Sequence, residues 1–175
     1  TGYYSATGIS AVSKYSYGDV TVTNSGSITA TAGPGNIYGY GAEAIGIDAY
    51  NYYGDVHVDN SGSITASSYS YSLLAGSATG VSAFSYYGNV DVANSGSITA
   101  DAESNSVYYG TSATGVYAVS VYGYTVDVAN SGSISANARS DYYSFYGETT
   151  AIGVDAINIF GDVLVTNAEG GSISA

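Results

Sequence analysis

The sequence predicts an all-β protein, and more narrowly a parallel β-solenoid of about five coils with three short strands in each coil. Three observations lead to this prediction. One motif returns five times along the 175 residues, its apolar residues alternate with a period of two, and Gly and Asn mark the junctions between the alternating stretches. A period of two is typical of a strand that buries one face.

The five copies form one repeat domain over residues 1–175. The first copy reads ATGISAVSKYSYGDVTVTNSGSITA, and the copies begin at Ala6, Ala44, Ala78, Ala113 and Ala151. The segments between them differ in length, so we expect variable loops at 31–43, 67–77, 101–112 and 137–150.

Each copy contains three alternating stretches. In the first copy, Ile9 lies in Gly-Ile-Ser-Ala, Val20 and Val22 lie in Gly-Asp-Val-Thr-Val-Thr-Asn, and Ile28 and Ala30 lie in Ser-Ile-Thr-Ala. We expect Gly and Asn at the junctions because the chain there needs a positive φ or a side chain that bonds its own backbone. Each copy is therefore expected to supply three strands.

Stacking of equivalent strands explains why the same residues return at the same places. An antiparallel β-sandwich also has regular strands and turns, but it does not require identical residues at identical positions. In a solenoid, each strand pairs with its equivalent one copy later, and the apolar residues form buried columns. We expect two such columns: Val20, Val56, Val90, Val126 and Val163, and Ile28, Ile64, Ile98, Ile134 and Ile173.

Two further columns are predicted at the turns. Asparagines that bond amide to amide are expected to play a structural part, at Asn24, Asn60, Asn94, Asn130 and Asn167. The last of them begins Asn-Ala-Glu-Gly-Gly-Ser-Ile, which has two extra residues, so this turn should bulge while the Asn column continues. Aromatic residues precede a glycine in every copy, at Tyr17, Tyr53, Tyr87, Tyr122 and Phe160. The pattern leaves open whether these rings lie inside or cover a face.

The repeated pattern A-x-G-[IV]-x-A followed by G-[DN]-V-x-V-x-N-S-G-S-I-x-A resembles the β-helical passenger repeats of bacterial autotransporters and haemagglutinin-type surface adhesins. The resemblance covers all five copies. It implies export by a Gram-negative bacterium and display at the cell surface or outside the cell. Such passengers include adhesins, biofilm proteins, toxins and enzyme carriers, so the resemblance is specific for architecture rather than for activity.

The composition argues against several classes of partner. Lys and Arg total 2 against 14 Asp and Glu, which gives a net charge of −12, and the two cations, Lys14 and Arg139, are far apart in sequence. A nucleic acid or an anionic membrane would require clustered basic residues. The apolar runs are too short to insert into a membrane as a helix. The chain has no Cys and lacks the P-loop, G-x-S-x-G and H-E-x-x-H motifs, so we expect no cofactor and no metal site.

One outward row carries the residues that could support chemistry. It runs Thr21, His57, Asp91, Asp127 and Leu164, and His57 is the only histidine of the chain. Two carboxylates about 5 Å apart beside a histidine could serve glycoside hydrolysis, and Asp91 and Asp127 could contribute to a calcium site. An ordinary solvated strand face is the interpretation that we favour, because no cation lies nearby in sequence to hold an acidic sugar and calcium takes six to eight oxygens.

Tyrosine is the most informative residue type, with 21 in the chain. Besides the turn column, tyrosines recur in or beside the loops, at Tyr38, Tyr40, Tyr69, Tyr71, Tyr108, Tyr109, Tyr142 and Tyr143, with a further pair at Tyr3 and Tyr4. Tyr is a rigid amphipathic contact group. We therefore expect a non-enzymatic structural or adhesive protein whose tyrosines contact glycans, a host or cell surface, or further copies of the chain. The alternative is a carbohydrate-active enzyme or its rigid carrier.

A solenoid exposes unpaired strand edges unless its terminal coils are capped. Neither 1–5 nor 172–175 has the character of a cap. We therefore expect the chain to belong to a longer array or to stack head to tail into a filament.

Overall fold

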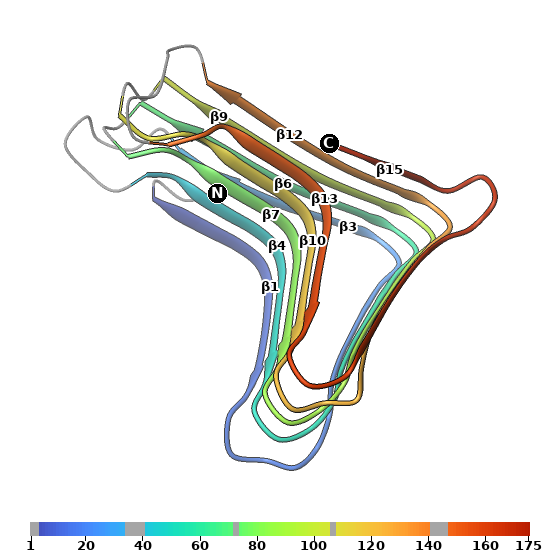
Figure 1. Ribbon diagram of the computed structural model, residues 1–175. Coiled ribbons are helices and arrows are strands. Elements are labelled where there is room, and N and C mark those ends of the chain that lie inside the picture. Colours follow the sequence, from blue (N-terminus) through green and yellow to red (C-terminus); the bar gives the residue numbers. More distant parts are fainter. Residues whose placement is uncertain (1–3, 34–40, 72–73, 106–107, 141–146) are drawn as a thin grey trace.

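The computed structural model describes residues 4–33, 41–71, 74–105, 108–140 and 147–175. Within these ranges it contains fifteen strands and no helix. The strands form three parallel five-stranded sheets, and each copy of the motif contributes one strand to each sheet (Figure 1). The predicted all-β parallel solenoid is confirmed.

The strands of each sheet follow one another in copy order. Sheet 1 contains β1 (Ser5–Ser13), β4 (Glu43–Asn51), β7 (Ser77–Ser85), β10 (Ser112–Ser120) and β13 (Thr150–Asn158). Sheet 2 contains β2 (Val20–Asn24), β5 (Val56–Asn60), β8 (Val90–Asn94), β11 (Thr125–Asn130) and β14 (Asp162–Asn167). Sheet 3 contains β3 (Ser27–Ala32), β6 (Ser63–Ser70), β9 (Ser97–Ser104), β12 (Ser133–Ser140) and β15 (Ser172–Ser174).

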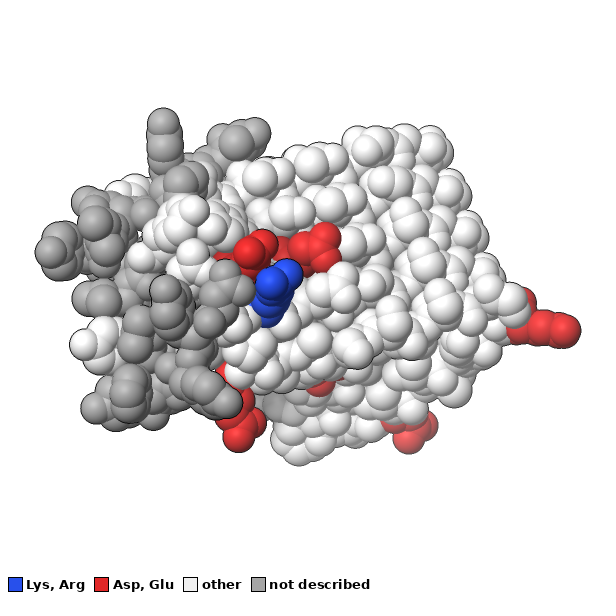
Figure 2. All heavy atoms as spheres, turned by 90° about the horizontal axis from the view of Figure 1, so that it is seen from above, with Lys and Arg blue, Asp and Glu red and all other residues white. Residues whose placement is uncertain are grey.

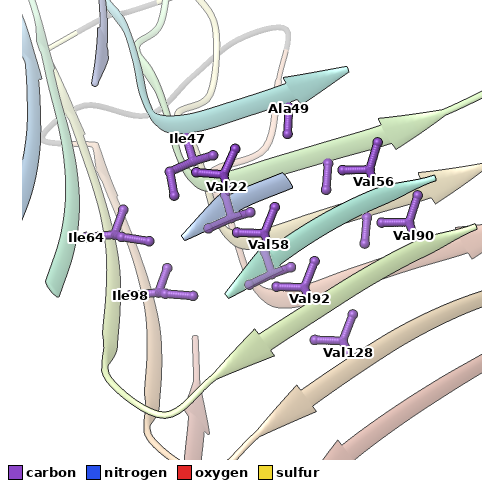
Figure 3. Close-up of a cluster of buried hydrophobic side chains, with 14 of the residues drawn as sticks. Val22, Ile47, Ala49, Val56, Val58, Ile64, Val90, Val92, Ile98 and Val128 are labelled. Carbon is purple, nitrogen blue, oxygen red and sulfur yellow. The ribbon is translucent and has the colours of Figure 1, made fainter. Parts of the chain in front are cut away.

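The main core lies where the three sheets face one another. Valines from sheet 2 point at isoleucines from sheets 1 and 3, as Val58, Ile47 and Ile64 do in Figure 3. The predicted valine and isoleucine columns pair in register from copy to copy. The expectation that they are buried throughout is wrong for the fifth copy, where Val163 is 44% and Ile173 is 36% exposed. These two residues lie on the edge strands β14 and β15, so no further strand covers their outer side.

A second core, built from alanine, lies between the first half of sheet 1 and the second half of sheet 3. Buried alanines from both sheets pack there, among them Ala44, Ala78, Ala102 and Ala113. In β6 and β9 the alternation of buried and less buried residues continues through Ser68 and Ala102, which are buried. The strands of sheet 3 are therefore longer than the sequence indicated. The loops predicted to begin at 67, 101 and 137 therefore begin later, after Ser70, Ser104 and Ser140.

A glycine lies at the bend of every sheet 1 strand. On β4 the inward positions run Ala44, then Ile47, Ala49 and Asn51, so the buried face shifts by one residue around Gly46. Figure 1 shows the bend in β1, β4, β7, β10 and β13. A side chain at Gly46 would collide with Ile64 Cγ2 and with the carbonyl oxygen of Gly80, so glycine is required for lack of space.

Of the two expected features of the junctions, the Asn-Ser-Gly-Ser turns show the side chain that bonds its own backbone, since Asn24 Oδ1 accepts from the Gly26 N–H at 3.1 Å. They do not show positive φ. Among the described residues, only Gly33 and Gly170 have positive φ. Crowding between copies explains the turn glycines instead: a Cβ at Gly62 or at Gly96 would collide with the carbonyl oxygen of the glycine one copy earlier. At the glycine position, successive turns therefore approach too closely for a side chain.

The outer face of sheet 3 is rich in hydroxyl groups. Its outward columns include Ser27, Ser63, Ser97 and Ser133, followed by Thr29, Thr65, Thr99 and Ser135. Figure 2 looks down on the molecule from this side and shows mostly uncharged surface. Figure 2 shows basic and acidic atoms side by side on this face. The register of the sheet pairs Arg139 with Glu103.

The steric role of the sheet 1 glycines gives a first prediction. We expect Gly80→Ala to lower the free energy of unfolding by about 1–3 kcal/mol, because the new methyl group overlaps Ile98 Cγ2 and the Gly115 carbonyl oxygen. Gly26→Ala is the matched control, since nothing lies within 4 Å of a Cβ there, and its effect should stay within about 0.5 kcal/mol. Denaturant unfolding followed by circular dichroism measures both. Equal effects of the two substitutions would contradict the steric explanation.

Candidate binding surface

The aromatic residues before the turn glycines form one continuous column along the solenoid. Ring centroids are separated by 4.8 Å between Tyr17 and Tyr53, 5.8 Å between Tyr53 and Tyr87, 5.4 Å between Tyr87 and Tyr122, and 5.0 Å between Tyr122 and Phe160. The last three pairs are stacked face to face, and the first is tilted by 35°. We call these five residues the ring column.

The ring column lies on the surface, which answers the question that the sequence left open. Its members are between 36% and 82% exposed. Tyr87 and Tyr122 are each stacked between two ring-column neighbours, so both faces of these rings are covered in part. The column therefore presents ring edges and phenolic hydroxyls to solvent.

Further rings extend this surface beside the column. Tyr52 stacks on Tyr86 at 4.9 Å, and Tyr50 stacks on Phe84 at 5.3 Å. Tyr52 and Tyr86 also meet the ring column edge-on, at 4.7 Å to Tyr53 and 4.9 Å to Tyr87 respectively. We call the ring column and these four residues together the aromatic patch. These second stacks were not predicted, although the Tyr-Tyr pairs before Gly54 and Gly88 are a visible signal in the sequence.

A column of buried polar residues fixes the turn that carries the rings. Asn51 Nδ2 donates to the carbonyl oxygens of Gly18 at 2.9 Å and of Asp55 at 3.0 Å. Ser85 Oγ, in the equivalent position, donates to the Gly54 carbonyl and accepts from the Gly88 backbone N–H, both at 2.8 Å. These side chains are fully buried. Their hydrogen bonds tie each turn to the turn before it, so the rings take the same position in successive copies.

A second polar series supports the outer side of the same turns. The carboxylate of Asp19 accepts from the Asp55 backbone N–H at 2.9 Å, and the carboxylate of Asp55 accepts from the Asn89 N–H at 2.7 Å. Asn89 Oδ1 accepts from the N–H groups of both Tyr124 and Thr125. Tyr124 is an extra residue of the fourth copy, so Asn89 accepts here from two successive N–H groups instead of one.

Two of the packed tyrosines have shifted acidities. Burial raises the pKa of Tyr52 above the ordinary value of 10.0, and repulsion from the phenolates of Tyr87 and Tyr53 raises it further. A side-chain hydrogen bond with Tyr122 is the largest cause of the raised pKa of Tyr86. Both phenols are therefore neutral hydrogen-bonding groups at physiological pH.

The five asparagines of the Asn-Ser-Gly-Ser turns form a second continuous column. Each Nδ2 donates to the Oδ1 of the next asparagine, at 2.8 Å from Asn24 to Asn60 and at 2.7 Å for the later pairs through Asn94 and Asn130 to Asn167. The first four are buried, and each also donates to backbone carbonyls. The first four asparagines are at most 7% exposed, whereas Asn167 is exposed.

The longer fifth turn bulges as expected. Ala168 N–H still donates to the Asn130 carbonyl, and Gly171 N–H closes the extra loop onto the Ala168 carbonyl at 2.9 Å, with Gly170 at a φ of 87°. Strand β15 then pairs with β12 in register.

The outward row on sheet 2 lies in the predicted register, and two of its residues are in contact. His57 Nδ1 is 2.9 Å from Asp91 Oδ2, and both side chains are partly exposed. Asp127 is in register with Asp91, and its Oδ1 is buried with no hydrogen-bond partner. Among the described residues, no group of three or more His, Cys, Asp or Glu is arranged to hold a metal ion.

The tyrosines assigned to the loops divide into three sets. Tyr69 lies at the end of β6 and meets Tyr71 edge-on at 4.7 Å. Tyr4, Tyr108 and Tyr109 are exposed. The remaining ones, Tyr3, Tyr38, Tyr40, Tyr142 and Tyr143, lie outside the described residues.

Comparison of the chain with protein-family models, with curated proteins and with solved structures finds no match. In the part of the chain that the structure describes, no helix has the length and hydrophobicity to cross a bilayer.

The Asn column gives a second prediction. We expect Asn94→Ala to cost about 1–3 kcal/mol of unfolding free energy, because it leaves the buried Nδ2 of Asn60 and Oδ1 of Asn130 without their partners. Asn167→Ala should cost less, since Asn167 is exposed and water can replace it. Thermal melts of both variants provide the measurement. An unchanged melting temperature in Asn94→Ala would show that the Asn column does not contribute to stability.

The acidity of Tyr52 and Tyr86 gives a third prediction. Both pKa values are raised in the folded state, so the unfolded chain loses these protons first as the pH rises. Their contribution to stability is complete below about pH 10 and declines as the pH rises through the folded-state values. Melting temperatures measured between about pH 9 and 11.5 should fall less steeply for a Tyr52→Phe/Tyr86→Phe variant than for the wild type. Identical slopes would contradict the assignment.

Proposed function

We propose that this protein is a non-enzymatic structural and adhesive solenoid, displayed at the surface of a Gram-negative bacterium or outside the cell. The observation that carries the proposal is the exposed aromatic patch on a rigid, in-register scaffold. Large exposed aromatic surfaces are typical of interaction sites, and rings held by stacking lose little further entropy when a partner binds. The motif's resemblance to autotransporter passenger repeats supports the location.

The geometry of the ring column favours a flat partner that forms hydrogen bonds. Stacking covers the faces of Tyr87 and Tyr122, so a partner meets ring edges at intervals of about 5 Å, together with the phenolic hydroxyls of the tyrosines. A glycan surface, the surface of a host or bacterial cell, or a second copy of the chain provides such groups. Self-association, head to tail or side by side, is included in the proposal.

The runner-up function is a carbohydrate-active enzyme or its carrier. The contact between His57 and Asp91, with Asp127 one copy further, is the observation that favours it. Incubation with a panel of polysaccharides and measurement of new reducing ends tests this candidate. If the wild type releases sugar and His57→Ala does not, an enzymatic function would replace the adhesive one.

A pair of substitutions in the ring column tests the adhesive function. Retention of the protein on surfaces coated with polysaccharide, with cells or with the protein itself should fall severalfold in Tyr87→Ser/Tyr122→Ser, because aromatic contacts carry much of the energy of an interface. Tyr124→Ser is the matched control: Tyr124 lies on the same side of the fourth copy and is 84% exposed, but it contacts no ring among the described residues.

A third variant separates packing from recognition. Tyr87→Phe/Tyr122→Phe retains the stack and removes the hydroxyl groups, so it should be folded by circular dichroism and show intermediate retention. Full retention in the serine variant would overturn the role of the ring column.

A further inference from the structure

An open pocket lies at the first-copy end of the aromatic patch. Its volume is about 420 Å³, and its lining residues are Lys14, Tyr15, Tyr50, Tyr52 and Tyr53. This volume falls within the range of small-molecule pockets, roughly 300–1,000 Å³. Residues 14 and 15 belong to a stretch of the first copy, Ser-Lys-Tyr-Ser-Tyr-Gly, that is two residues longer than Asn-Tyr-Tyr-Gly of the second copy.

The two inner stacks begin at this pocket. Tyr50 is covered on one face by Phe84, and Tyr52 is covered on one face by Tyr86. Toward the first copy, Tyr50 is in register with Val12, and among the described residues no first-copy ring stacks on Tyr50 or Tyr52. The pocket therefore offers ring faces, whereas the ring column offers mainly edges. A flat ligand in the pocket would lie on these ring faces and add one further ring to the stacks.

The pocket also contains a cation. Lys14 is the only lysine of a chain with a net charge of −12. Its side chain is exposed, and among the described residues it has no carboxylate within salt-bridge distance. The Tyr52 phenol, whose pKa is raised by burial, is a neutral hydrogen-bond donor in the lining.

We propose that this pocket binds a pyranose ring that carries a carboxylate, as in a uronic-acid residue of an acidic polysaccharide. The apolar C–H face of the sugar lies on the rings of Tyr50 and Tyr52, the carboxylate lies at the Lys14 ammonium, and the phenols accept and donate hydrogen bonds at the rim. The inference rests on the proposed adhesive function and gives one end of the aromatic patch a class of ligand.

The overall negative charge does not prevent this contact. At about 0.15 M salt the Debye length is roughly 8 Å, so distant carboxylates of the protein are largely screened from the pocket, while an ion pair at contact distance is screened less. An ion pair on an exposed side chain such as Lys14 contributes about 0.2–1 kcal/mol, which corresponds to up to roughly fivefold in affinity.

Oligogalacturonide and its methyl ester are a matched pair of probes. They have the same rings, and the ester lacks the charge. Because the chain contains no tryptophan, the change in tyrosine fluorescence reports ring contact, and saturation-transfer NMR provides a second readout. At about 0.15 M salt, the acid should bind roughly two- to fivefold more tightly than the ester.

Substitutions inside and outside the pocket test whether the acid binds at this site. Lys14→Gln should abolish the preference for the acid, and Lys14→Arg should retain most of it. Tyr124→Ser, outside the pocket, should bind as the wild type does. No binding of the acid, equal binding of acid and ester, or an unchanged preference in Lys14→Gln would each overturn the inference.

Failure of the pocket inference and failure of the proposed function give different results. If oligogalacturonide does not bind but the ring-column variants lose retention, only the pocket inference fails. If it binds through Lys14 but Tyr87→Ser/Tyr122→Ser retains full adhesion, the role of the ring column fails and the pocket stands.

Discussion

The backbone pairing of each strand with its equivalent one copy later is the constraint on which the rest of the structure depends. Parallel pairing at about 4.8 Å places equivalent residues directly above one another. A side chain must therefore be compatible with a copy of itself as a neighbour. Asparagine meets this condition inside a turn through amide-to-amide hydrogen bonds, valine and isoleucine meet it in the core, and aromatic rings meet it at the surface by stacking.

This constraint explains what the sequence could reveal. The valine, isoleucine and asparagine columns followed from alternation and repetition alone, because these properties are local and recur at fixed positions. The steric need for glycine at position 46 did not, since it comes from the proximity of Ile64 and Gly80, which are distant in sequence. The alanine core was missed for a related reason. Alanine is common in many contexts, and only the facing sheet shows that Ala44 and Ala102 belong to a buried cluster.

The candidate site was predictable in part. The ring column could be identified from five aromatic residues before five glycines, but its exposure depends on which way the turn faces. The buried hydrogen bonds of Asn51 and Ser85 determine that direction, and these residues differ in type from copy to copy. A column that contains Ser in some copies and Asn in others lacks the exact repetition that makes a series visible in the sequence.

The departures from the repeat are therefore where this solenoid gains specific properties. Identical copies produce a uniform surface, and a uniform surface can offer only repeated contacts of one kind. The ring column is such a surface, and stacking leaves it few free ring faces. The first copy lacks rings in register with Tyr50 and contributes Lys14, so the stacks end at an open pocket beside a cation. In a solenoid, in-register repetition supplies rigidity, and an interruption of that repetition supplies a site with its own shape and charge.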